Sequence, residues 1–403
     1  MNFNKQILYS IYLAFFPFFL ILGNASLNFY FLFSCIIFIY ELIKFKKKKL
    51  DFFLKENDFL LIIFFLLIFL VSAVNNFSFD LILILRFLFF YFFIKLIFIN
   101  EFINLKIFLN IIFIFFIFVL FDTLFQYFFG FDIFGFKISI NHSGRLTGPF
   151  GDEPIPGSFI VSFMFIVFYF NNNYFTNKYF GYLLLFLALL TILLTGEKIS
   201  FLMSLLGLFL LLIFNLYRLN FLHIIYTLII FSIICYLIIE NNPILYARYL
   251  ELFSYLNSDI FFKSQYIHHF LTSYMMVIDF PLLGIGHDNF KNLCKLDTYE
   301  KFKTIFLHLR CANHVHNLHF QIISSYGIIT YLIFIYFTFY NLLKFFSFKI
   351  KDRAPIFIQL FILVIPLKTT GDIFSSWYGS LFWFSLSFLF FMLRYSNSSN
   401  QNN

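Results

Sequence analysis

The sequence is poor in charged residues, which make up 12% of its 403 residues against about 25% in soluble domains. This scarcity excludes an ordinary soluble protein and indicates an integral membrane protein. The sequence also lacks the alternating segments of about ten residues that build an outer-membrane barrel. Its net charge of +8 gives no sign of a nucleic-acid-binding surface, and we attribute it to membrane topology and to contact with anionic lipid.

Long apolar runs are what the sequence does have. It is 62% hydrophobic and 25% aromatic, and runs near the ~20 residues that a helix needs to cross a bilayer recur along its whole length. We expect an uncleaved first helix and not a signal peptide, because the many later spans need no removable leader. The pattern predicts an all-α, polytopic membrane protein of about twelve transmembrane helices, at residues 7–23, 25–43, 58–74, 80–99, 107–129, 157–171, 179–195, 199–216, 221–239, 316–340, 355–369 and 373–393.

These spans divide the chain into three parts. Residues 1–239 form a bundle of nine helices with an outer loop at 130–156, and residues 316–403 hold the last three helices and a short tail. Residues 240–315 between them form a large outer loop before the tenth helix, in which we expect short helices lying over the membrane face. Lys and Arg concentrate in the connections opposite these two loops, so the positive-inside rule places that basic side and both termini in the cytoplasm.

A histidine stands where the large loop meets the tenth span. His316 and Asn317 are followed by Gly327 and Thr330, and at 100° per residue Gly327 returns to within about 20° of the His316 face of a helix. Small residues there would let another helix approach closely. The spacing predicts an inward-facing helix whose mouth presents His316 to the outer compartment. The alternative is a histidine that only contacts water at the interface.

The motif H-N-x9-G-x-x-T is similar to the signature of the O-antigen ligase and O-antigen polymerase superfamily, which includes bacterial O-oligosaccharyltransferases. GRLTGPFGDE (144–153), TGEKISFL (195–202) and PLLGIGHDNF (281–290) resemble family segments in the same order. The resemblance implies a metal-independent, inverting glycosyltransferase of GT-C type in the bacterial inner membrane, without a cofactor. It would take a glycan from an undecaprenyl-diphosphate carrier at the periplasmic face and pass it to lipid A-core or to another carrier-linked glycan.

The resemblance also implies roles for single residues. The family histidine, thought to activate the acceptor hydroxyl, corresponds to His316; a neutral imidazole accepts protons near neutral pH, and a positioned base contributes ~10²–10⁴-fold. Asn317 either positions the acceptor or caps the helix. A diphosphate leaving group needs cations, and the candidates are Lys198 and Arg145. Lys198 replaces the usual family arginine, which keeps the charge but loses a bidentate fork; alternatively it is an interfacial lysine reaching for water.

Two further basic positions are candidates for substrate binding. The second arginine of the ligases is absent from residues 263–274, and His269 is our first substitute for it, ahead of Lys263 and Arg248. Arg86 lies inside an apolar run, where a charge costs at least ~2.5–3.5 kcal/mol at the bilayer centre. We expect Arg86 to face the bundle interior and to meet either a carrier phosphate or a buried acid.

The large loop also holds two cysteines. Cys294 and Cys311 lie close before His316, and an oxidising compartment favours a disulfide between them; the alternative is two free thiols. Four histidines and Cys311 also lie close together in this part of the sequence. We expect no metal site there, because this set of residues follows no structural-zinc spacing and has no obvious carboxylate base nearby. We expect His314 to shape the loop and His319 to support His316. The set consists of His308, Cys311, His314, His316 and His319.

Ligase activity is our first expectation, and O-antigen polymerase and protein O-oligosaccharyltransferase are the alternatives among enzymes. Outside enzymes, a flippase or transporter of lipid-linked glycans is the alternative. A transporter would show internal repeats, broken helices and polar residues near the midplane. The polar residues of this sequence concentrate at one interface, which favours catalysis.

Overall fold

The computed structural model describes residues 2–44, 58–75, 80–138, 144–174, 178–215, 221–254, 264–299, 310–346, 353–366 and 368–395. Over these ranges the regular structure is helical, apart from one antiparallel bridge between Phe131 and Lys137. The helices are α1 (Asn2–Ala14), α2 (Phe16–Leu22), α3 (Asn24–Lys44), α5 (Asp58–Val74), α6 (Asp80–Ile99), α7 (Leu105–Phe129), η3 (Gly148–Phe150), α8 (Pro156–Tyr174), α9 (Lys178–Thr195), α10 (Lys198–Asn215), α11 (Phe221–Glu240), α12 (Pro243–Ser254), α14 (Gln265–Asp279), α15 (Phe290–Leu293), η5 (Asp297–Tyr299), α16 (Leu318–Phe346), α17 (Ala354–Val364) and α18 (Trp377–Tyr395).

Several helices are long and apolar enough to cross a membrane, so the expectation of an all-helical, multi-pass membrane protein is confirmed. The predicted number of twelve transmembrane helices is not confirmed. In the described ranges five stretches pass by length and composition, and a sixth passes if α11 and α12, bent by 113°, count as one span. Other apolar helices are shorter, such as α5 and α17. The five stretches are Asn4–Leu22, Asn24–Lys44, Leu81–Ile99, Leu105–Phe129 and Leu318–Leu343.

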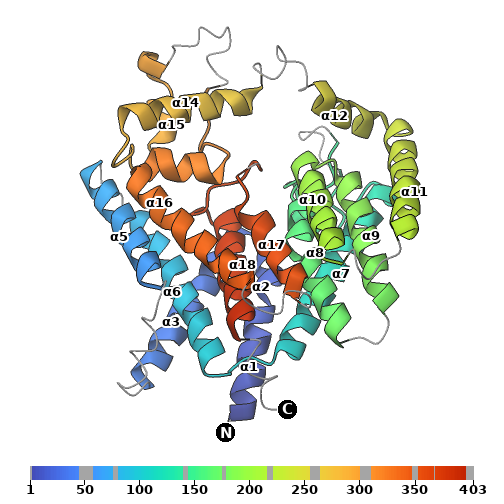
Figure 1. Cartoon of the computed structure of the whole chain (residues 1–403), viewed down its shortest axis with the longest axis horizontal. Coiled ribbons are helices and arrows are strands. Elements are labelled where there is room, and N and C mark those ends of the chain that lie inside the picture. The colour runs from blue at the N-terminus through green and yellow to red at the C-terminus, as the bar shows by residue number, and fades with distance from the viewer. Residues whose placement is uncertain are drawn as a thin grey trace.

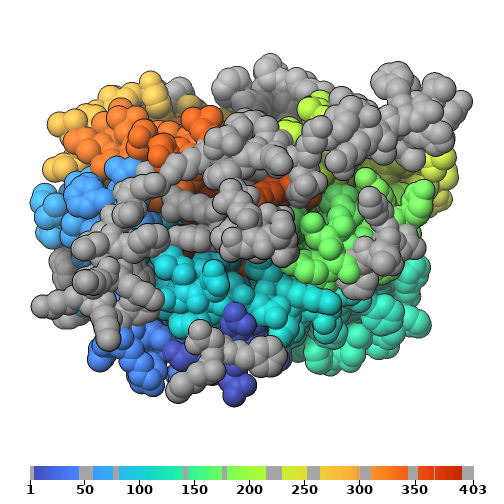
Figure 2. Space-filling view, turned by 60° about the horizontal axis from the view of Figure 1, so that its bottom comes forward, coloured from blue at the N-terminus to red at the C-terminus, as the bar shows by residue number. Residues whose placement is uncertain are grey.

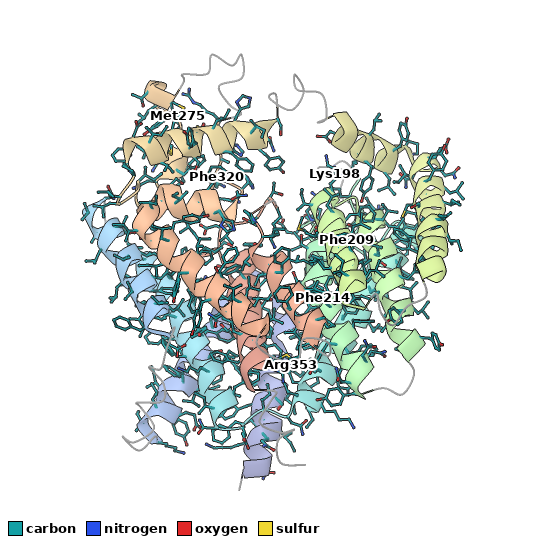
Figure 3. The ribbon with its side chains drawn as sticks, in the orientation of Figure 1. Lys198, Phe209, Phe214, Met275, Phe320 and Arg353 are labelled. Carbon is teal, nitrogen blue, oxygen red and sulfur yellow. A yellow bond between two sulfur atoms is a disulfide. The ribbon has the colours of Figure 1, made fainter. Side chains whose placement is uncertain are left out.

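The helices form a bundle with two distinct ends (Figure 1). α16 packs on α5, α18 on α6, and α17 on α8 and α10. α14 lies across the upper end, above α16. At the lower end, turned forward in Figure 2, α1 (dark blue) lies beside the cyan segment that includes α7. Figure 3 shows Lys198 at the upper end of α10 and Arg353 far below it, so the two cations mark opposite ends.

A break in α16 receives the segment 281–286. Gly327 has φ 80° and ψ 171° in the middle of the helix, a conformation that only glycine adopts readily. The backbone of the segment fills the gap: the N–H of Ile285 donates to Ser324 O (2.9 Å), and the N–H of Ile328 donates to Pro281 O (2.9 Å). The expectation of one continuous helix from His316 through Gly327 to Thr330 is therefore wrong, because a distant segment takes over hydrogen bonds that the helix would make.

We expect Gly327→Ala to lower the stability of the protein by about 2 kcal/mol or more, since a Cβ there adds both backbone strain and a clash. That Cβ would lie 2.0 Å from the carbonyl oxygen of Leu282. The melting temperature in detergent measures the effect. Gly151→Ala is the matched control, because Gly151 has φ 65° but no atom within 4 Å of its Cβ position. Equal melting temperatures for the two variants would contradict the close fit.

Candidate active site

His316 lies just outside α16. The carboxamide oxygen of Asn317 accepts hydrogen bonds from the N–H groups of His319 (3.0 Å) and Phe320 (3.1 Å). This makes Asn317 the N-cap, so that α16 begins at Leu318 and His316 precedes it. His316 itself has φ 60°, in the left-handed region where non-glycine residues are uncommon and often functional.

Asn317 uses both ends of its side chain within the protein. Its amide nitrogen donates to the carbonyl oxygens of Pro366 (2.7 Å) and Lys368 (3.3 Å), while its oxygen caps α16. A carboxamide has two donors and one oxygen with two lone pairs, so this arrangement saturates it. Of the two interpretations of Asn317, the structure shows the helix cap. The N–H of Thr370 also donates to the carbonyl of His316 (2.9 Å), which ties the α17–α18 loop to the site.

Aromatic rings from two segments surround the His316 imidazole. The centroid of the His314 ring is 4.0 Å away, and the His269 ring of α14 stacks at 5.3 Å and 22°. Tyr266 of α14 meets the ring edge-on at 5.6 Å. The structure thus brings the predicted His269 to His316, and adds His314 and Tyr266, for which we predicted no chemical role. We call His314, His316, His269 and Tyr266 the histidine cluster.

The histidine cluster favours neutral imidazoles. Burial lowers the pKa of His316 to about 3, and the neighbouring His314 and His269 add to the effect because a second positive charge beside them is unfavourable. His316 is therefore neutral at any physiological pH and has a lone pair to offer. In the described ranges no three His, Cys, Asp or Glu residues are grouped so as to hold a metal ion, and His308 lies outside those ranges.

His319 does not support His316, contrary to our expectation. Its Nε2 lies 2.8 Å from the carbonyl oxygen of Val364 in α17, and its Nδ1 lies 3.2 Å from the hydroxyl of Tyr331. Because α16 begins after His316, the side chain one turn into the helix points to α17 instead. His319 joins α16 to α17.

A cluster of cations lies beside the histidine cluster. Arg145 is half-buried and donates from Nη2 to the carbonyl oxygen of Pro154 (2.6 Å). The carboxylate of the buried Glu197 attracts it. Glu197 accepts hydrogen bonds from the N–H groups of Gly157 (2.6 Å) and Ser158 (2.9 Å), at the start of α8. The carboxylate thus anchors the amino end of α8 and offsets part of the Arg145 charge.

Helix α12 folds back over the turn between α9 and α10 and completes this cluster. Arg248 donates from Nε to the carbonyl oxygen of Gly196 (2.9 Å), and its charge repels that of Arg145. Lys198 forms an ion pair with Glu251 at 2.6 Å, in which the Lys198 side chain is 16% exposed and that of Glu251 49%. Arg248, which we ranked behind His269 as a substitute, thus lies near enough to Arg145 for the two charges to interact. Lys263 lies outside the described ranges.

Tyr266 connects the two clusters. Its ring contacts His316, and its phenol interacts electrostatically with Arg145. The amino end of α14 therefore stands between the neutral imidazoles and the guanidinium groups. Figure 3 shows Lys198 at the same upper end as Phe320, the third residue of α16. The sequence signal for Tyr266 is only its place three residues before His269.

Arg86 meets neither a described acid nor the two clusters. Its Nη1 donates to the side-chain oxygen of Asn28, which also accepts from Ser376 (3.3 Å). Its guanidinium lies 4.6 Å from the centroid of the Phe87 ring. The buried acid that we expected for Arg86 is therefore not seen in the described ranges, whereas Lys95 of the same helix does pair with an acid, Asp58.

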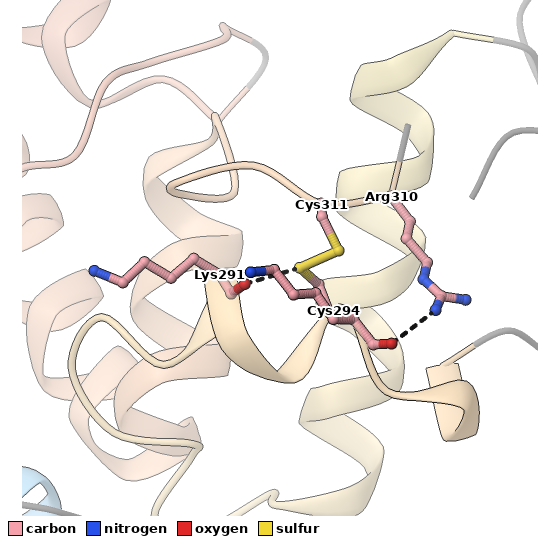
Figure 4. The surroundings of a disulfide bond; sticks show 5 residues. Lys291, Cys294, Arg310 and Cys311 are labelled. Atoms are coloured by element: carbon pink, nitrogen blue, oxygen red, sulfur yellow. Dashed lines mark hydrogen bonds between the residues drawn. A yellow bond between two sulfur atoms is a disulfide. The ribbon is translucent and has the colours of Figure 1, made fainter. Parts of the chain in front are cut away.

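The two outer cysteines are joined. Cys294 and Cys311 form a disulfide with their Cα atoms 5.3 Å apart (Figure 4). Next to it, Arg310 donates to the carbonyl oxygen of Lys295 (3.1 Å). Cys294 is fully buried in a small apolar cluster that includes Val315, the residue between His314 and His316. The disulfide therefore fixes the segment that leads into the histidine cluster.

We expect the Cys294→Ser, Cys311→Ser double variant to lose ~3 kcal/mol of stability on the loop-closure estimate. Mass spectrometry of protein from native membranes, under non-reducing conditions, detects the linked peptides directly. Cys235→Ser is the control, since Cys235 is a free thiol in α11. Two free thiols in the native protein would contradict the pairing.

Comparison with known proteins agrees with the position of the site. Residues 183–335 match the family model described as O-antigen ligase. The match begins in α9 and ends in α16, so it includes Lys198, Arg248, His269 and His316, and it leaves out Arg145 and the α17–α18 loop. No curated protein matches the chain. The resemblance noted in the sequence is thereby confirmed for this part of the chain: residues 183–335 of this multi-pass membrane protein form a domain of the O-antigen ligase and polymerase superfamily, whose members are glycosyltransferase-like enzymes.

Proposed function

We propose that the protein is an O-antigen ligase of the bacterial inner membrane. It would transfer a glycan from an undecaprenyl-diphosphate carrier to lipid A-core at the periplasmic face, by an inverting mechanism of GT-C type and without a metal. The observation that carries the proposal is the position of Tyr266, whose ring contacts His316 and whose phenol interacts electrostatically with Arg145. Neutral imidazoles and guanidinium groups therefore lie near the same side chain. A glycosyl transfer from a diphosphate donor needs that pair of properties.

The charge of each cluster determines the part of the reaction that we assign to it. The leaving diphosphate gains negative charge as the glycosidic bond breaks, and Arg145 and Lys198, with Arg248, stabilise it. The acceptor hydroxyl binds on the other side of Tyr266, where His316 is the proposed activating residue: it contacts the hydroxyl and promotes loss of its proton. His269, stacked on His316, keeps that imidazole in place. Arg86, which lies apart from both clusters, is proposed to contact a phosphate of the carrier lipid.

Transfer in a purified system tests the function. The protein in liposomes receives an undecaprenyl-diphosphate-linked oligosaccharide and lipid A-core, and we expect a new glycosidic bond to form equally well with and without EDTA. Loss of transfer on chelation, restored by zinc, would overturn metal independence. Movement of the donor between leaflets without a new bond would instead identify a flippase.

A deletion strain distinguishes the acceptors. If the core lipid carries no glycan while long polymer accumulates on the carrier lipid, the protein is a ligase, which is the expected result. Core lipid that carries a single repeat identifies a polymerase. An unchanged lipopolysaccharide together with unglycosylated periplasmic proteins identifies a protein O-oligosaccharyltransferase.

The orientation has its own test. We expect alkaline phosphatase fused after residue 150 or 290 to be active, and the same enzyme fused after residue 50 to be inactive, because the basic segment 44–49 retains its side in the cytoplasm. Fusions are compared at equal expression. Activity only after residue 50 would reverse the orientation and move the site to the cytoplasmic face.

A further inference from the structure

His314 lies beside His316, but its ring is held differently. The imidazole of His314 hydrogen-bonds the backbone of Thr370, whose N–H is already donated to His316, so the carbonyl oxygen is the partner. Nε2 of His314 is buried and has no hydrogen-bond partner in the described part of the chain. The bond to Thr370 therefore uses Nδ1. A carbonyl only accepts, so Nδ1 carries the proton and Nε2 has a free lone pair.

The loop that orients His314 also supplies an acid. Asp372 lies two residues after Thr370, and its carboxylate attracts a positive charge on His314. Asp372 is held by its own turn, in which its Oδ1 accepts the N–H of Phe374 (2.8 Å). A carbonyl that accepts a hydrogen bond from one ring nitrogen orients a histidine. A carboxylate nearby stabilises the protonated form of that histidine.

In the described part of the chain, the His316 ring has neither a carbonyl nor a carboxylate of this kind beside it. The groups around its ring are His314, His269 and Tyr266, and burial with the two histidines lowers its pKa to about 3. A base is most effective when its pKa lies near the working pH. His316 thus suits contact with a hydroxyl better than retention of its proton.

We propose that His314 is a second catalytic residue, whose Nε2 receives the proton of the acceptor hydroxyl while His316 holds that hydroxyl by a hydrogen bond. This inference rests on the proposed function. As the O–H bond breaks, its electron pair forms the bond from oxygen to the anomeric carbon. The bond from that carbon to the diphosphate breaks, and its electron pair leaves with the diphosphate. The proton stays on His314, offset by Asp372, until water removes it.

Two variants test the proposal in the purified transfer assay, with His268→Gln as control. His314→Gln removes the base and keeps an amide that can donate to Thr370, while Asp372→Asn removes the charge and keeps an oxygen for Phe374. We expect His314→Gln to lower kcat by about 100-fold or more with an unchanged Kd for labelled undecaprenyl diphosphate. His268 is buried in α14 outside the histidine cluster, so its variant should keep its activity.

The pH dependence of kcat separates a catalytic role from a structural one. The titratable groups facing His314 are Asp372 of the α17–α18 loop and His316 of its own segment, with His269 of α14 beyond His316. Burial lowers the pKa of His314, and the carboxylate of Asp372 opposes that shift. In Asp372→Asn the pKa of His314 should therefore fall further, and the acid limb of the kcat profile should move to lower pH. If His316 were the sole base, His314→Gln would move that limb to higher pH and leave kcat intact.

The outcomes distinguish the inference from the function beneath it. An active His314→Gln beside an inactive His316→Asn would overturn the role of His314 and leave the proposed function standing. Wild-type protein that neither binds labelled undecaprenyl diphosphate nor transfers glycan would overturn both. Two results together would support both: a folded His314→Gln protein that binds the donor but has lost kcat, and an acid limb of the kcat–pH profile that is shifted in Asp372→Asn.

Discussion

The His316→Ala variant is expected to fold and insert like the wild type and to transfer glycan about 100-fold more slowly or worse. His316 precedes α16 and contributes its carbonyl, and not its ring, to the hydrogen bond from Thr370. The backbone contact therefore survives the substitution. What is lost is the imidazole that faces the acceptor between His314 and His269. The rate of transfer in liposomes at saturating donor measures the loss.

The left-handed backbone at position 316 requires a second variant. Alanine disfavours φ near 60°, whereas asparagine adopts it more readily, so His316→Asn removes the basic ring with less strain. Both variants should be equally inactive and should melt near the wild-type temperature. Near-normal transfer by a well-folded His316→Asn protein would defeat the assignment of His316. An inactive Ala variant beside an active Asn variant would show that the backbone, and not the ring, matters.

Replacing Arg145 by methionine is expected to weaken binding of undecaprenyl diphosphate by about 10- to 100-fold, because a hydrogen bond to a charged group contributes about 1.5–3 kcal/mol. Lys198→Ala should weaken binding less, since Lys198 is already paired with the half-exposed Glu251. Lys198→Arg should retain or improve binding, since a guanidinium restores the bidentate fork. Equilibrium binding of labelled undecaprenyl diphosphate measures all three.

A matched lysine provides the control for these cation variants. Lys291 also pairs with an acid, Asp288, and both side chains are nearly half exposed, but it lies in α15, away from Arg145. Lys291→Ala should leave the Kd unchanged. Glu251→Gln should tighten binding, because it removes the negative charge that is paired with Lys198. Equal affinities for Arg145→Met and Lys291→Ala would remove Arg145 from the diphosphate site.

Local features of the chain were predictable from the sequence. The membrane class and the helical fold follow from apolar runs, because transfer into a bilayer depends on the residues of one segment. The resemblance to the family follows from segments whose order the chain preserves, and the domain match confirms it for residues 183–335. The predicted number of twelve spans is not confirmed, because several apolar helices in the described ranges, such as α5 and α17, are shorter than the five stretches that pass by length and composition.

The sequence by itself determined a membrane-embedded helical protein and the residue types of the site, His316, Lys198 and Arg145. Only the tertiary structure decided how they are presented. Asn317 caps the start of α16 while its amide nitrogen donates to the α17–α18 loop. Gly327 breaks the same helix because residues 281–286 supply the missing hydrogen bonds. Helical periodicity assumes that a segment satisfies its own backbone. In this protein, segments roughly 40 to 50 positions away satisfy it instead, and the packing of α14 on α16 brings His269 and Tyr266 to His316.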